Sequence, residues 1–169
     1  MPSRLLILSL AVAALSAVEL SADGSKAVVP DPAKPLTAAS AGRTVTWTLG
    51  RDPATLTIAI ELHAGAGGSA KARAQELLAE AVQGGAKISD EKGMGGGFHL
   101  LEAQGDAGKP VKRVAVASAR SAWLSVLVTS TGGFNAEWND RNALDGLLQT
   151  ITLDGTAVIP PTALRFLLP

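Results

Sequence analysis

The longest run of strand-type residues in this chain lies within residues 111–153, which read VKRVAVASA-RS-AWLSVLVTST-GG-FNAEWNDRNALDGLLQTITL. Two segments rich in β-branched residues are joined by a tight turn at Arg120-Ser121, which is the pattern of a β-hairpin. After the double glycine, Leu144, Leu147, Leu148 and Ile151 recur at helical spacing. This stretch therefore predicts two antiparallel strands followed by an amphipathic helix, and we expect it to form the folding core.

Two upstream segments alternate in the same way. Residues 43–49 and 55–63 each place apolar side chains on one side and mostly threonines on the other, so they predict a second hairpin. Ser69 is a good N-cap for a helix over residues 70–83, which the double glycine at 84–85 ends. Shorter strands are predicted at 87–92, as a polar edge strand, and at 98–104.

The predicted order is β-β-α-β-β-β-β-α, an α+β domain in which two main helices flank an antiparallel sheet. The strand ending in VLVTSTGG (126–133), followed by a helix with Trp138 and the run LLQTI (147–151), resembles the PsbP-like superfamily over residues 43–153. That group includes a photosystem II extrinsic subunit, a Ran-binding nuclear import protein and many exported bacterial proteins. The resemblance implies a helix-flanked antiparallel sheet, but because the members have different roles it implies no activity.

The two ends of the chain are expected to lie outside this domain. Residues 1–22 have one basic residue, an apolar run and then small residues, which is the layout of a secretory signal peptide. Three tripeptides partly fit its cleavage rule: ALS (14–16), LSA (15–17) and LSA (20–22). Residues 23–42 are expected to form a Pro/Ala/Ser-rich tether, and residues 154–169 a C-terminal tail whose Pro160-Pro161 stops a continuing helix.

Composition limits the partners. The chain has no cysteine, so it has neither disulfides nor thiolate metal sites, and its 15 basic and 15 acidic residues cancel. This balance does not indicate nucleic-acid binding. With the leader removed, no integral membrane segment is expected. The protein is therefore predicted to be periplasmic or extracellular, and export without disulfides indicates a bacterial envelope protein.

One glycine-rich motif suggests a ligand site. Gly65, Gly67, Gly68 and Ser69 follow a strand and open a helix, and with Asp90 downstream they fit the dinucleotide fingerprint G-x-G-x-x-G/A. However, the preceding strand alternates, whereas the first strand of such a fold is apolar on both faces. No cofactor is therefore assigned, and a flexible strand-to-helix connection is the favoured interpretation.

The remaining chemistry-bearing residues give no catalytic or metal assignment. His63 and His99 have no metal-ligand spacing and are expected at the surface or at loop edges. The three tryptophans are expected to fill the core. Met94 and Phe98 border a second glycine-rich stretch, 93–97, and are the better candidates for an exposed contact.

Three functions follow as hypotheses. The first is a non-enzymatic module that binds a protein or envelope partner through loops at one end of the sheet. The second is a small-molecule or anion binder at the loop containing Gly65 and Ser69. The third is a hydrolase that uses carboxylates which the sequence does not single out.

Overall fold

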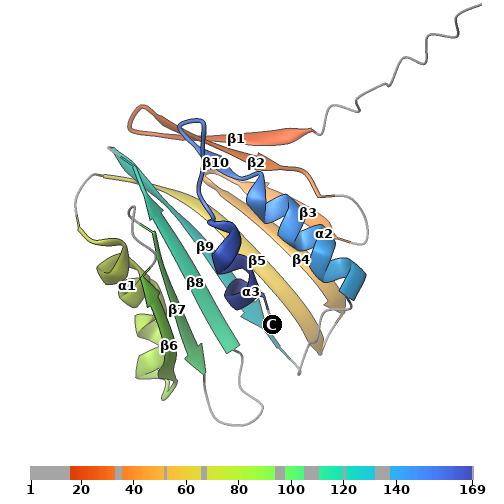
Figure 1. The fold of residues 1–169 in the computed structure, drawn as a ribbon, viewed down its shortest axis with the longest axis vertical. Helices are drawn as coiled ribbons and strands as arrows, with labels where there is room; N and C mark the ends of the chain where they lie inside the picture. Colours follow the sequence, from red (N-terminus) through yellow and green to blue (C-terminus); the bar gives the residue numbers. More distant parts are fainter. Residues whose placement is uncertain are drawn as a thin grey trace, which may run out of the picture.

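The computed structural model describes residues 16–32, 36–51, 53–65, 68–93, 98–104, 111–119, 121–131 and 138–168. The described chain is an α+β structure with three helices and antiparallel sheets (Figure 1). In chain order its elements are β1 (Ala17–Ala22), β2 (Ser25–Pro30), β3 (Thr37–Ala41), β4 (Thr44–Arg51), β5 (Ala54–Ala64), α1 (Ala70–Gln83), β6 (Lys87–Gly93), β7 (Phe98–Gln104), β8 (Val111–Ser118), β9 (Ala122–Ser130), α2 (Trp138–Gln149), β10 (Thr152–Leu153), β11 (Thr156–Ala157) and α3 (Pro161–Leu167).

The larger sheet has seven strands in the order β3-β4-β5-β9-β8-β7-β6, and every neighbouring pair is antiparallel. The strand β9 lies in its centre, between β5 and β8, which agrees with the apolar residues that the sequence has on both of its faces. The strand β6 is an edge strand, as predicted from its polar sequence. The hairpins β4–β5 and β8–β9 predicted from alternation are both present.

The helix α1 covers one face of this sheet over β7 and β8. Its buried residues Ala70, Ala74 and Leu78 pack with a set on the sheet that comprises Leu101, Ala103, Val114, Val116 and Trp123. The predicted N-cap is confirmed, because Ser69 Oγ accepts the Ala72 N–H at 3.1 Å. The helix ends in a Schellman motif: the Ala86 N–H donates to Ala81 O at 2.9 Å, and Gly85 has φ +95°.

The helices α2 and α3 cover the opposite face of the same sheet. Leu144 and Leu148 of α2 and Leu164 of α3 are buried against the apolar residues of β4, β5 and β9. Burying each of these leucine side chains stabilises the fold by about 2 kcal/mol. The hydrophobic cluster on this face is the larger of the two. The side chain of Trp47 is completely buried here, as expected for a core tryptophan.

No helix in the described part of the chain is both long enough and apolar enough to cross a membrane.

The N-terminal region corrects the expected tether. Residues 17–30 form the hairpin β1–β2, in which Leu20, Ala27 and Val29 are buried in the main core. Residues 37–41 form β3 at the edge of the large sheet. The folded part of the chain therefore includes strands well before residue 43, because alternate residues of β1 and β2 cover one end of the core.

The C-terminal region corrects the expected tail in the same way. The strands β10 and β11 complete a second, four-stranded sheet with the order β1-β2-β10-β11. The helix α3 begins at Pro161, where a missing N–H costs nothing, since the first helical N–H groups have no intrahelical partner. Its residues Ala163, Leu164 and Leu167 are buried.

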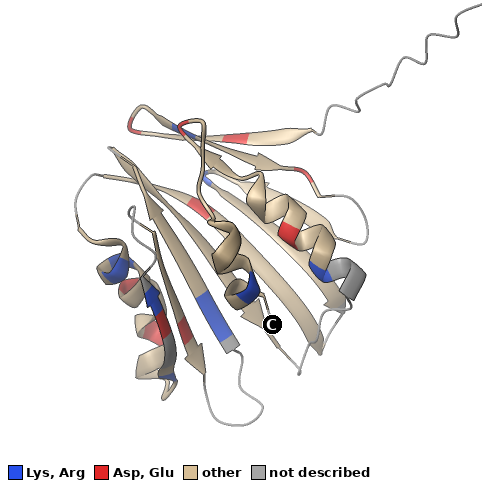
Figure 2. Ribbon diagram, in the orientation of Figure 1, with Lys and Arg blue, Asp and Glu red and all other residues tan. Residues whose placement is uncertain are grey.

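No helix of the described residues lies over one part of the large sheet. On the side that α1 occupies further along, β4 and β5 present half-buried residues, mostly threonines: Thr44, Thr46, Thr48, Thr55 and Thr57. Figure 2 shows charged residues concentrated on α1 and β6, whereas β3 and β4 are almost free of them. We call the surface formed by these threonines of β4 and β5 the open face.

Candidate functional site

The connections between strands meet at one end of the large sheet. In the antiparallel order, β5, β8 and β6 finish at the same end at which β9 and β7 begin. The pairs Ala64↔Ala122 and Phe98↔Ala117 mark this end. Gly65 and Gly93, one from each glycine-rich stretch of the sequence, therefore border it, and we call it the loop end. Gly67 and Met94 lie outside the described residues.

The loop containing Gly65 is fastened to its neighbours. The Gly65 N–H donates to Ser121 O at 3.1 Å and to Asp23 Oδ2 at 3.0 Å. Gly65 has φ +100°, which favours glycine at this position. The side chain of Ser69 already caps α1. The Gly65 N–H and the Ser69 hydroxyl, both in the loop expected to bind a ligand, are thus already hydrogen-bonded within the chain.

A second network ties the small sheet to the loop end. Ser25 Oγ lies 2.8 Å from Ser121 Oγ and 3.0 Å from Asp154 Oδ2. The Lys26 N–H donates to Asp154 Oδ1 at 2.8 Å. Because both carboxylate oxygens of Asp154 are engaged, the turn between β10 and β11 is held in a fixed position beside the end of β8.

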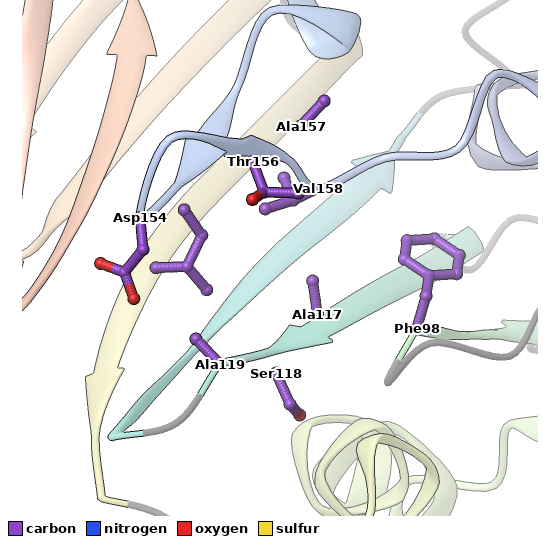
Figure 3. A pocket seen from close by; sticks show the side chains of 9 residues that line it. Phe98, Ala117, Ser118, Ala119, Asp154, Thr156, Ala157 and Val158 are labelled. Carbon is purple, nitrogen blue, oxygen red and sulfur yellow. The ribbon is translucent and has the colours of Figure 1, made fainter.

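An open cavity of about 610 Å³ lies between this turn region and the ends of β7 and β8 (Figure 3). Its walls present polar and apolar surface in similar amounts, with polar groups from Ser118, Asp154 and Thr156. The apolar lining consists of Phe98, Ala117, Ala119, Leu153, Ala157 and Val158. A cavity of this composition suits an apolar side chain that carries a hydrogen-bond donor beside it.

Phe98 corrects one expectation about this region. It was predicted as an exposed contact beside the glycine-rich stretch; it does begin the predicted strand, β7, but its side chain is only 7% exposed. It belongs to the main core and at the same time forms a wall of the cavity. The main role of this aromatic side chain is therefore packing in the core.

Two cations occupy the first turn of α1, where the helix dipole disfavours positive charge. Each has a partner in the protein. Lys71 pairs with Glu91 of β6, and the Arg73 guanidinium lies over the Trp123 ring, 4.4 Å from its centroid. The hydrogen bond from Lys71 is the main cause that lowers the pKa of Glu91. These contacts account for both cations without an added anion.

His63 and Trp123 form the most concentrated polar and aromatic group outside the cavity. Their rings are stacked, with centroids 3.7 Å apart and planes at 8°. His63 Nε2 lies 2.9 Å from Ser125 Oγ, and Nδ1 lies 3.7 Å from Glu61 Oε1. Burial lowers the pKa of His63, so the ring is neutral near pH 7.

A serine beside a neutral histidine and a carboxylate has the residue types of a nucleophile–base pair. The geometry is unsuitable for acyl transfer in two respects. Ser125 is only 3% exposed, so its hydroxyl is out of reach of a substrate. It also lies within a strand paired on both sides, so nearby backbone N–H groups are used in the sheet rather than aimed at an oxyanion.

The histidines were expected at the surface or at loop edges. Both lie near a strand end, but neither is exposed: His63 is half-buried, and His99 is 8% exposed with Nε2 3.4 Å from Glu91 Oε1. Their strands are separated in sequence, so spacing along the chain gave no sign of these pairings. Within the residues that the structure describes, no group of three or more acidic or histidine side chains could hold a metal ion.

No protein-family model, curated protein or solved structure matches this chain.

Proposed function

We propose that this chain is an exported, non-enzymatic binding domain that holds a protein partner at the loop end of its large sheet. The observation that carries the proposal is the cavity of about 610 Å³ at that end. Export is supported by the leader-like sequence of residues 1–22. The buried position of Ser125 favours binding over hydrolysis.

The cavity's lining indicates the kind of partner. Alanine, leucine and valine side chains accept an apolar group, while Thr156 and Ser118 offer hydroxyls near the opening. The turn that holds Asp154 is fixed by Ser25 and Lys26, so the cavity exists before a partner arrives. We infer that the partner inserts one apolar side chain from an exposed loop or strand.

We also propose that the fold is of the PsbP-like type. The succession β4-β5-α1-β6-β7-β8-β9-α2, with helices on both faces of an antiparallel sheet, supports this proposal. The additional hairpin β1–β2 and the helix α3 would then be elaborations at its two ends.

Site-specific photo-crosslinking tests the binding proposal. Ala157 lies at the cavity and is exposed, and Ala143, exposed on α2, provides a matched control position. A photoreactive residue at 157 should give a discrete product in an envelope extract, and the same residue at 143 should not. Excess unlabelled parent protein should suppress this product.

A cavity-filling variant makes the test specific. Ala157→Trp should block the cavity and lose the ability to compete, whereas Ala143→Trp should compete like the parent. Circular dichroism checks that both variants fold. Equal competition by both variants, or identical products from positions 157 and 143, would contradict the proposal. Phe98 is unsuitable for such a test because its removal would damage the core.

A further inference from the structure

The large sheet has two edges, and they differ in how well they are protected. An edge strand presents unpaired backbone N–H and C=O groups that can pair with another chain. In β6 the pairing is interrupted by an irregularity between Ile88 and Asp90, and Lys71 of α1 reaches across to Glu91. Charged side chains and a bulge are the usual means of blocking an edge.

Within the described part of the chain, the opposite edge, β3, has none of these devices. Its five residues, TAASA, are all exposed and carry no charge. The pairing with β4 runs without interruption from Thr37↔Thr48 to Ala41↔Thr44. Ala38 and Ser40 lie opposite the buried Trp47 and Val45 of β4, yet both are exposed, so α2 does not extend over this strand.

The strand is therefore preorganised on one side and open on the other. The ladder to β4 holds its backbone extended, and the adjacent Leu36 is buried and anchors its start. An incoming strand would meet backbone groups already in position, so little conformational entropy is lost on the receiving side.

We propose that β3 pairs with β3 of a second copy of this chain, which joins two seven-stranded sheets into one. A twofold axis perpendicular to the sheet keeps equivalent faces on the same side. The register that uses all five residues under this symmetry is centred on Ala39, with Thr37 opposite Ala41 of the second copy. The formal net charge of zero leaves no overall repulsion between copies.

Two observations favour a second copy over a foreign strand. Recognition of a foreign peptide at an edge takes its specificity from side-chain pockets, and the cavity at the loop end is lined by no residue of β3. In the symmetric register, Thr37, Ala39 and Ala41 of both copies also lie on the side of the open face, so that face continues across the junction. About four to six hydrogen bonds would join the copies, which indicates a weak dimer.

Charge-swap variants at the proposed axis test the register. In the dimer, residue 39 faces its own equivalent, so Ala39→Lys and Ala39→Glu should each abolish association by placing like charges together. An equimolar mixture of the two variants should restore it. Because Ala39 is exposed, neither change disturbs the fold of a single copy.

Sedimentation velocity over a wide concentration range provides the measurement, with the full chain expressed so that any processing of its N-terminus takes place. The parent should shift from the monomer mass toward twice that mass as concentration rises. Lys87→Glu, on the opposite edge, should behave like the parent. The proposal fails if the parent stays monomeric, if either variant at position 39 associates like the parent, or if the mixture does not recover.

Discussion

The stack of His63 on Trp123 joins residues that are 60 positions apart in the chain but directly opposite each other in β5 and β9. Alternation predicted which side of β5 faces the core, and it placed Glu61 and its neighbours on the other side. It could not show that Arg73 of α1 lies over the Trp123 ring. This contact makes that side of β5 a half-buried site. A surface histidine was therefore predicted where the fold creates a partly enclosed one.

The surroundings of His63 set its response to pH. Burial is the main cause that lowers its pKa, and the positive charges of Arg43 and Arg73 act in the same direction. The carboxylates of Glu61 and Glu76 oppose them. The folded chain thus binds a proton at His63 less tightly than the unfolded chain does. The contribution of the neutral His63 ring to the free energy of unfolding is therefore complete above pH 6.5, and it is lost as pH falls through the lowered pKa.

We predict that the free energy of unfolding decreases between pH 7.5 and pH 5, and that His63→Phe reduces this decrease. Phenylalanine keeps a flat ring against Trp123 but cannot bind a proton. At pH 7.5 the variant should be less stable by about 1 kcal/mol, because Ser125 Oγ loses its partner. Urea unfolding at several pH values measures both effects. Parallel pH profiles for parent and variant would contradict the assignment.

Among the elements, those with a regular local pattern were predicted and those held by distant contacts were missed. The strands β4 and β5 and the helix α1 carry their period, caps and turns in consecutive residues. The hairpin β1–β2 follows directly after an apolar leader-like run, which hides its own alternation. Its turn did carry a signal: Asp23-Gly24 has φ of 48° and 80°, the backbone of a type I′ hairpin turn.

The same dipeptide recurs between β10 and β11, where Asp154 and Gly155 have φ of 51° and 77°. These two Asp-Gly pairs are hairpin signals, but a third pair, Asp145-Gly146, lies inside α2, so the dipeptide alone does not identify the second sheet. The helix α3 was missed for a different reason, because prolines stop a helix only from within it. At the first helical position of α3, Pro161 is favourable.

Two glycine-to-alanine substitutions should have opposite effects. Gly24 has φ +80° with no atom near an added Cβ, so Gly24→Ala should cost about 1 kcal/mol through the backbone alone. Gly146 lies exposed within α2, also with free space, so Gly146→Ala should stabilise by about 0.5–1 kcal/mol. Chemical unfolding of both variants under one condition tests the pair. Stabilisation by both substitutions would show that the turn at Gly24 is not held as described.

At the level of the molecule, the antiparallel α+β class followed from the order of elements, but the limits of the domain did not. The main core includes residues from Leu20 to Leu168, so both ends of the described chain pack on one body. Proline- and alanine-rich segments were predicted as tether and tail because they lack a long period. Their apolar residues are buried by strands and helices far away in the sequence, which no local window can detect.

This single core bears on where a leader could be removed. The cut after LSA (20–22) would delete all of β1, including Leu20, which is 2% exposed, and would leave one side of β2 unpaired. Losing Leu20 alone would cost about 2 kcal/mol. The cut after ALS (14–16) falls immediately before Ala17, so every paired residue of β1 is kept. The cut after LSA (15–17) removes only the first of them.

If the chain is exported as proposed, we predict that its mature form begins at Ala17 or Val18 rather than at Asp23. Intact-mass measurement of the secreted chain distinguishes these positions directly. A chain engineered to begin at Asp23 should unfold at clearly lower urea concentration than one beginning at Ala17, because Ala27 and Val29 lose the cover of β1. A secreted protein that starts at Asp23 with full stability would mean that β1 contributes nothing to the core, contrary to its burial.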